Sequence, residues 1–221
     1  MNITVVLAMT ADGKIGNVRR EAARFASIND KKHLEKQLSL ADGVLFGAGT
    51  LRSYGTTLPI CDTQFLQSRK EQGKPPQPIQ IVCSASGRIV CNLVFFSQPV
   101  PRWLLTTVTG AKLWQKGNEF ERILIAGEDS EIDWNRALIQ IEDRGIKNLA
   151  VLGGGELVAS LLAEDLVNEL WLTICPIIFG GAAAPTPVEG EGLLLPKKLE
   201  LISLSRLEQE VFLHYRRVCD D

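Results

Sequence analysis

Short apolar runs alternate with segments of helical periodicity along the whole chain, and this alternation constrains the fold more than any other feature. The apolar runs, bounded by turn residues, predict buried strands, and the segments between them predict amphipathic helices. We expect strands at residues 3–9, 43–46, 79–83, 103–106, 122–126, 149–152 and 170–174. Strands that alternate with helices indicate an α/β fold, with a mixed, mostly parallel sheet and helices on both faces.

Three predicted helices have recognisable ends. Ser27 and Asp30 match a capping box, with Ser27 as the N-cap and the Asp30 carboxylate in the first turn, where capping explains it. Asp133 caps a second helix, and Gly145 ends it. A third helix begins near Leu157 and is amphipathic.

The other segments predict turns, a loop and a strand pair. Asp12-Gly13 forms the turn after the first strand, and the polar residues 61–78 form a surface loop. Residues 199–203 and 211–215 alternate in polarity and predict a C-terminal antiparallel pair. We place His33, one residue before an apolar face, on the surface.

Composition narrows the class of protein. The 221 residues can form a single domain, and 24 Lys and Arg against 26 Asp and Glu give no basic surplus for nucleic acid. Five cysteines without a C-x-x-C pair suit reduced thiols in a cytoplasm, and with two histidines we expect no metal site. No leader and no membrane-spanning run is recognisable.

Three strand ends carry glycine or small polar residues. Gly153-Gly154-Gly155-Glu156-Leu157 joins a strand to a helix, and Gly47-Ala48-Gly49-Thr50 follows another strand. Glycines let a pyrophosphate approach the free amide groups of a helix start, but tight turns would explain the same residues. Neither run has the spacing of the G-x-G-x-x-G fingerprint, which disfavours a standard Rossmann domain. Ser84 and Arg88 could bind the 2′-phosphate of NADPH or belong to a solvated turn.

Five segments carry a family resemblance that covers almost the whole chain. They are residues 8–15 (AMTADGKI), 41–50 (ADGVLFGAGT), 151–157 (VLGGGEL), 166–173 (LVNELWLT) and 176–181 (PIIFGG). In this order they resemble the dihydrofolate-reductase-like fold. More closely, they resemble the reductase domain at the C-terminus of the bacterial bifunctional riboflavin deaminase-reductases.

The resemblance implies one reductase domain over residues 1–221, without a deaminase domain, that binds NADPH and forms a homodimer. Hydride would reach the ribose carbon attached to the pyrimidine amine and open the ring to a ribityl chain. The residues assigned to the cofactor are Ala8, Thr10, Gly47, Gly49, Thr50, Ser84, Arg88, Gly153, Gly154, Gly155, Glu156 and Leu157.

The chain departs from the family where the substrate binds. Tyr54 occupies the position of an acid in the family, Cys61 that of an arginine and Leu152 that of a glutamate. Where the family has a Ser-x-Trp sequence, this chain has Ala22-Ala23-Arg24. The candidates for substrate contact are Arg24, Arg52, Tyr54 and Leu58, and the candidate proton donors are Tyr54 and Asp30.

The sequence thus predicts an NADPH-dependent reductase of a pyrimidine- or pterin-like substrate. The best named activity is reduction of 5-amino-6-(5-phosphoribosylamino)uracil in riboflavin biosynthesis. The alternatives are dihydrofolate reduction and a catalytically silent NADPH-binding dimer.

Overall fold

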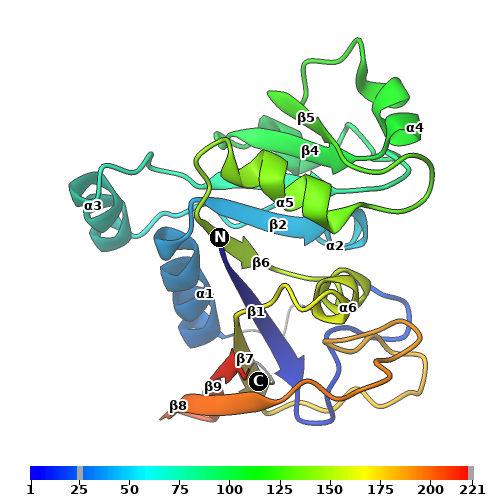
Figure 1. Ribbon diagram of the computed structural model, residues 1–221. Helices are drawn as coiled ribbons and strands as arrows, with labels where there is room; N and C mark the ends of the chain where they lie inside the picture. Colours follow the sequence, from blue (N-terminus) through cyan, green and yellow to red (C-terminus); the bar gives the residue numbers. More distant parts are fainter. Residues whose placement is uncertain (24–26, 219–221) are drawn as a thin grey trace. The chain divides into compact units, whose positions relative to one another are not determined.

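The computed structural model describes residues 1–23 and 27–218. The chain divides into two compact units, which are described separately (Figure 1). The first unit comprises Met1 and Glu35–Ala150, and the second comprises Asn2–Leu34 and Val151–Asp221.

The first unit has a strand order of β5-β4-β3-β2-β6. Its strands are β2 (Gly43–Gly47), β3 (Ile79–Cys83), β4 (Arg102–Thr106), β5 (Arg122–Ile125) and β6 (Asn148–Val151). The strands β2 to β5 pair in parallel. The helical segments are α2 (Ala48–Tyr54), α3 (Thr63–Glu71), α4 (Val108–Ala111), α5 (Trp134–Glu142), η1 (Val94–Ser97) and η2 (Lys112–Trp114).

The second unit has a strand order of β1-β7-β9-β8. These strands are β1 (Asn2–Thr10), β7 (Glu169–Cys175), β9 (Glu210–Arg217) and β8 (Leu199–Leu207). β1 and β7 are parallel, whereas β7–β9 and β9–β8 are antiparallel. The unit also holds α6 (Gly155–Ala163) and the first half of α1 (Ile28–Leu40). The predicted mixed, mostly parallel sheet with a C-terminal antiparallel pair is therefore confirmed.

All predicted strands are present, and their ends agree within two residues except that β8 continues to Leu207. The predicted N-caps are also confirmed. The Ser27 hydroxyl accepts hydrogen bonds from the amides of Asn29 (3.0 Å) and Asp30 (3.2 Å), and Asp133 accepts one from Arg136. Local capping chemistry thus sets these two helix starts.

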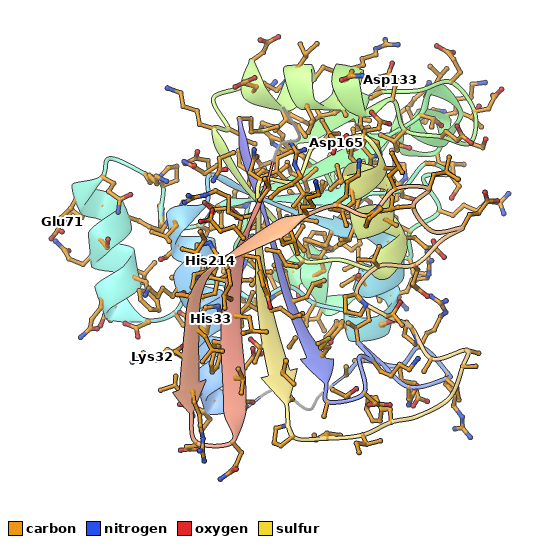
Figure 2. The ribbon with its side chains drawn as sticks, turned by 60° about the horizontal axis from the view of Figure 1, so that its bottom comes forward. Lys32, His33, Glu71, Asp133, Asp165 and His214 are labelled. Carbon is orange, nitrogen blue, oxygen red and sulfur yellow. The ribbon has the colours of Figure 1, made fainter. Side chains whose placement is uncertain are left out.

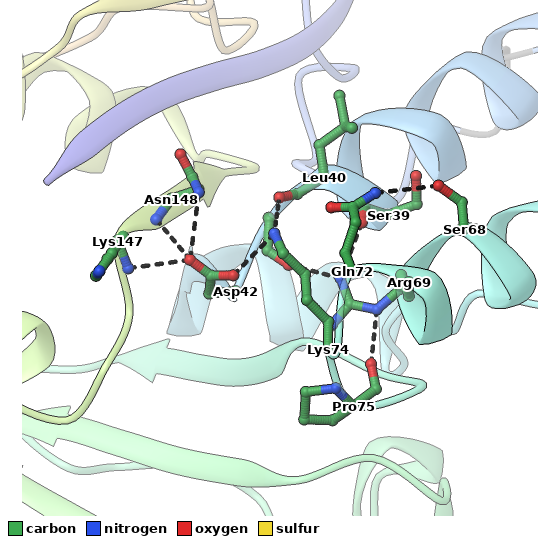
Figure 3. A network of polar contacts seen from close by, with 11 residues as sticks. Ser39, Leu40, Asp42, Ser68, Arg69, Gln72, Lys74, Pro75, Lys147 and Asn148 are labelled. Atoms are coloured by element: carbon green, nitrogen blue, oxygen red, sulfur yellow. Dashed lines mark hydrogen bonds and ion pairs between the residues drawn. The ribbon is translucent and has the colours of Figure 1, made fainter.

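The prediction of a surface loop over residues 61–78 is wrong, because α3 lies inside that range. Asp62 caps α3, and Arg69, only 1% exposed, anchors it. The Arg69 guanidinium donates to the backbone oxygens of Pro75 (2.7 Å), Ser39 (2.9 Å) and Ala41 (2.7 Å) (Figure 3). The helix is held through a buried cation instead of an apolar stripe, so hydrophobic periodicity could not reveal it.

A second difference concerns the segment after Thr50, where no helix was predicted. It is the helix α2, so Arg52 and Tyr54 lie on a helix. Among the helices that the structure describes, none is both long and apolar enough to span a membrane.

Candidate functional site

The triple glycine lies between β6 and α6, as predicted. Gly153 has a φ of +89°, a conformation that favours glycine, and the Gly153–Gly154 peptide is cis. Gly154 is the N-cap of α6 and makes no side-chain cap. The first amides of α6 therefore lack the side-chain acceptor that most helix starts have, which leaves them suited to an anion.

Gly155 is explained by the protein's own packing. A Cβ atom at this position would collide with the carbonyl oxygen of Thr186 and would lie 2.7 Å from Cγ of Glu189. The amide of Glu189 donates to the Gly155 oxygen (3.1 Å), and its carboxylate pairs with Arg20 (2.8 Å). The third glycine is thus required by the loop that covers it, whether or not a ligand binds. Glu156 remains exposed beside it.

The strand end of β1 is a closed turn. The Thr10 hydroxyl donates to Asp12 Oδ1 (2.5 Å) and accepts from the amide of Lys14 (2.9 Å). The hydrogen bond from Thr10 lowers the pKa of Asp12, which also accepts from the amides of Phe179 and Gly180. Thr10 and Asp12 therefore fix the turn, which confirms Asp12 as a turn former, while Ala8 is half-buried further back along the strand.

Asp30 is a buried acid, only 6% exposed, in the first turn of α1. Burial raises its pKa, the nearby Glu210 carboxylate raises it further, and a hydrogen bond with Thr173 opposes both. The amide of Ser27 donates to Glu210 Oε1 (3.3 Å), so the capping-box interpretation holds for Ser27 and is wrong for Asp30. An acid in this setting tends to keep its proton, which suits it to act as a proton donor.

The surroundings of Asp30 are polar but enclosed. Glu210 is 3% exposed and accepts hydrogen bonds from the Ser27 hydroxyl (2.5 Å) and the Cys175 thiol (3.7 Å). Burial, with Asp30 and Glu210 adding to it, raises the pKa of Cys175 to about 12. Nothing in the sequence indicated Glu210, because a lone glutamate at a strand start has no distinguishing pattern. Among the described residues, no group of His, Cys, Asp and Glu is arranged to hold a metal ion.

His33 is not a surface residue as predicted. It is half-buried, with its ring centroid 4.8 Å from that of Trp171 and 5.0 Å from that of Phe212. His214 stacks on Trp171 at 4.1 Å and lies 3.0 Å from Glu169. His33 and His214 are labelled in Figure 2. These rings join α1 to one face of the β7–β9 pair.

In the first unit, the glycine turn after β2 is open. Gly47 caps α2 without a side-chain hydrogen bond. A Cβ atom at Gly49 would meet nothing closer than Arg52 Nη2 at 3.8 Å, so the space next to this glycine is unfilled, in contrast to Gly155. Arg52 and Tyr54 are exposed, whereas Thr50 and Leu58 are half-buried.

The turn after β3 is built into the protein instead of being solvated. The Thr106 hydroxyl donates to the Ser84 oxygen (2.7 Å), and Trp114 Nε1 donates to the Gly87 oxygen (2.6 Å). Gly87 packs so closely on Gly110 that a side chain would not fit. Arg88 is exposed and lines a cavity of about 220 Å³ together with Trp114. Ser84 and Arg88 thus stand on a rigid turn beside a concave surface.

The predicted cofactor residues are divided between the two units. Ala8, Thr10 and residues 153–157 belong to the second unit, and Gly47, Gly49, Thr50, Ser84 and Arg88 belong to the first. Among the other candidates, Arg52, Tyr54 and Leu58 belong to the first unit and Asp30 to the second. Arg24 lies outside the described residues.

Comparison with known proteins decides the family, because a model of the RibD C-terminal domain matches residues 1–213. The chain belongs to the RibD C-terminal domain family. Its match as a RibD C-terminal domain spans both units.

Two relatives share the name 2,5-diamino-6-ribosylamino-4(3H)-pyrimidinone 5′-phosphate reductase. The protein from Archaeoglobus fulgidus is 25% identical, over 90% of this chain and 91% of its own length. The protein from Aquifex aeolicus is 29% identical, over 89% of this chain and 86% of its own length.

Solved structures agree on the fold of this RibD C-terminal domain. A pyrimidine reductase-like protein from Corynebacterium diphtheriae has a TM-score of 0.84 at 19% identity, covering 99% of this chain and 92% of that one. Dihydrofolate reductase from Enterococcus faecalis, complexed with NADP(H), has a TM-score of 0.55 at 13% identity, covering 98% and 96%. The predicted dihydrofolate-reductase-like fold is confirmed.

Proposed function

We propose that the chain is an NADPH-dependent reductase of riboflavin biosynthesis that acts on a ribosylamino-pyrimidine 5′-phosphate. The observation that carries this proposal is the similarity, over about nine-tenths of the chain, to two relatives named as reductases of such a compound. A single reductase domain over residues 1–221 is part of this proposal. The substrate is the diamino-pyrimidinone of those names or the deaminated 5-amino-6-(5-phosphoribosylamino)uracil that the sequence favoured.

The residues at the two glycine turns fit a dinucleotide. The start of α6 has no side-chain cap, and the space next to Gly49 at the start of α2 is unfilled. Backbone amides at Gly154, Gly155, Glu156 and Leu157 would bind phosphate oxygens, because a helix N-terminus attracts anions. Within the first unit, Gly47, Gly49 and Thr50 stand at another helix start without a side-chain cap and are the other proposed cofactor residues.

The 2′-phosphate and the nicotinamide of the cofactor would be bound by other residues than its pyrophosphate. Ser84 and Arg88, on the rigid turn next to the 220 Å³ cavity, would bind the 2′-phosphate through a hydroxyl and a guanidinium. Ala8 and Thr10 would lie near the nicotinamide, with Thr10 keeping the β1 turn in place through Asp12. NADPH, when bound, supplies the hydride for the reaction.

Asp30 is the proton donor in this proposal. Ring opening and reduction of a ribosylamine need a proton as well as a hydride, and a buried carboxyl group with a raised pKa is better suited to supply it than an exposed one. Thr173 orients the carboxyl group through its hydrogen bond, and Glu210 discourages its ionisation. Tyr54, 40% exposed, and the neighbouring Arg52 and Leu58 would contact the substrate, as would Arg24.

The test is a spectrophotometric assay with purified protein, NADPH and each of the two ribosylamino-pyrimidine phosphates. We expect loss of the nicotinamide absorbance with one of them, and product analysis should show a ribitylamino-pyrimidine. Absence of turnover with both substrates would refute the assignment. NADH in place of NADPH tests the role of Arg88, since only NADPH has the 2′-phosphate.

Dihydrofolate reduction is a second candidate, and Asp30 favours it, because a buried carboxyl group with a raised pKa on the first helix suits the protonation that accompanies hydride transfer to a pterin. Dihydrofolate in the same assay separates the two. A silent NADPH-binding dimer would quench Trp fluorescence with NADPH, since Trp114 lines the cavity, but would turn over none of the three substrates.

We also propose a homodimer in a cytoplasm, as the family resemblance implies. The cysteines support a reducing compartment, because Cys61, Cys83, Cys91 and Cys175 are all free thiols.

A further inference from the structure

The start of α1 lies on one face of the strand pair formed by β7 and β9. Thr173 pairs with Phe212, and two positions further on, just beyond the last pair, the two strands carry Cys175 and Glu210. Side chains two positions apart along a strand point to the same face of the sheet, so these four residues share a face. The ring of His33, on α1, packs on Phe212, which places α1 on that same face.

Glu210 joins this helix start to the end of β7. Its Oε1 accepts hydrogen bonds from the amide of Ser27 (3.3 Å) and the thiol of Cys175 (3.7 Å), and its Oε2 accepts one from the Ser27 hydroxyl (2.5 Å). Glu210 is only 3% exposed, so these protein groups stand in for water around its carboxylate. We call Glu210, Ser27 and Cys175 the Glu210 clamp.

The clamp encloses Asp30 from two sides. On α1, the Ser27 hydroxyl that donates to Glu210 also accepts from the amide of Asp30 (3.2 Å). On β7, the side chain of Thr173, which shares a hydrogen bond with the Asp30 carboxyl group, stands two positions before Cys175. The contacts of one carboxylate therefore fix both the helix turn that carries Asp30 and the strand end that Asp30 meets.

We propose that Glu210 is a positioning residue of the reductase reaction, which holds the Asp30 carboxyl group against β7 through Ser27 and Cys175. The inference rests on the proposed function, in which Asp30 is the proton donor. Such a donor must lie within hydrogen-bond reach of the atom that it protonates, and a misplacement of about 1 Å can cost about 100-fold in rate. Glu210 is not itself the donor, because its two oxygens already accept three hydrogen bonds.

The clamp also places a second acid near Asp30. Asp30 faces Cys175 from β7 and Glu210 from β9, and His33 lies one turn further along α1. Burial is the main reason that the pKa of Asp30 is raised; the hydrogen bond with Thr173 opposes it, and the Glu210 charge adds to it. Replacing Glu210 with Gln keeps its size and removes that charge, so the Asp30 pKa should fall. Asp30 would then lose its proton at a lower pH than in the wild type.

The test is a double-mutant cycle of Glu210→Gln and Asp30→Asn, assayed with NADPH and each ribosylamino-pyrimidine phosphate over a range of pH. We expect Glu210→Gln to lower kcat by about tenfold or more, with little change in the KM for NADPH, because the donor is displaced. The fall in kcat with rising pH should also begin at a lower pH. With Asp30→Asn already present, Glu210→Gln should change kcat by less than about twofold, since no donor remains to be held. Glu208→Gln is the matched control, because Glu208 is exposed and lies two residues before Glu210.

A second measurement needs no substrate. Carbon-13 NMR follows the titration of the aspartate carboxyl groups, and the Asp30 signal is identified by its absence from Asp30→Asn. We expect this signal to titrate at a lower pH in Glu210→Gln than in the wild type or Glu208→Gln. Circular dichroism checks that each variant is folded. If Glu210→Gln does not fold, Ser27→Gly takes its place in the cycle, because it removes the clamped hydroxyl and glycine replaces a capping serine at little cost.

A folded Glu210→Gln with the wild-type kcat at every pH would overturn the positioning role. An equal loss of kcat with and without Asp30 would overturn it as well, because Glu210 would then act through another group. A wild type that reduces neither substrate would overturn the reductase proposal itself. In that case the NMR titration still decides whether Glu210 acts on Asp30, and identical Asp30 titrations in the wild type and Glu210→Gln would show that it does not.

Discussion

Replacing Arg69 with Met should destabilise the protein strongly. None of the residues to which Arg69 donates a hydrogen bond is a predicted site residue. The substitution keeps the aliphatic stem and removes the guanidinium, which donates to the oxygens of Pro75, Ser39 and Ala41. A buried acceptor left without its donor costs about 1–3 kcal/mol. Three acceptors at the lower end of that range give about 3 kcal/mol, because part of the loss is offset by no longer burying a cation.

For a chain of this size, a loss of 1 kcal/mol lowers the melting temperature by roughly 2–4 °C. We therefore expect Arg69→Met to melt about 6–12 °C below the wild type in a calorimetric scan. Lys70→Met is the matched control, because Lys70 is the next residue of α3 and is exposed, so it should stay within about 0.5 kcal/mol. If Arg69→Met and Lys70→Met melt together, the guanidinium does not anchor α3 and the hydrogen-bond accounting is wrong.

Three further predictions concern the site. Asp30→Asn should lower kcat by about 100-fold or more. Because the raised pKa of Asp30 makes wild-type stability fall as pH rises through it, the variant should lose this slope in urea titrations at several pH values; an unchanged kcat would exclude Asp30 as the donor. Gly155→Ala should cost about 1–3 kcal/mol in urea and weaken NADPH binding, since its methyl group collides with Thr186; unaltered stability and binding would contradict that packing. Iodoacetamide at pH 8 should label Cys61 and spare Cys175, whose pKa is about 12; mass spectrometry showing equal labelling would count against the burial of Cys175.

The parts of the fold that follow from apolar patterning and local capping were predictable. Strand β3 was predicted to the residue, and Ser27 and Asp133 were identified as caps, because these signals depend on neighbouring residues alone. Helix α3 was missed since its anchor, Arg69, binds backbone oxygens up to thirty positions away in the sequence. Such long-range polar contacts leave no periodic trace.

The positions of the glycine turns in the candidate site could be predicted from the sequence, whereas the burial of Asp30 could not. The run at residues 153–157 was located correctly, but Gly155 is required by Thr186 and Glu189, which no local pattern could indicate. Asp30 was assigned to capping because its sequence position suits a helix start. Its burial depends on Thr173 and Glu210, which reach it only through the pairing of β7 and β9.

Strand β8 contains one additional residue, Ile202, at which its register with β9 shifts between Leu201 and Ser203. Deleting one codon there would restore regular alternation and turn the side chain of Leu204 from one side of the sheet to the other, without altering any leucine. A short insertion or deletion in an edge strand could therefore change in one step which face of the sheet carries its leucines, whereas point substitutions would have to replace the leucines one at a time.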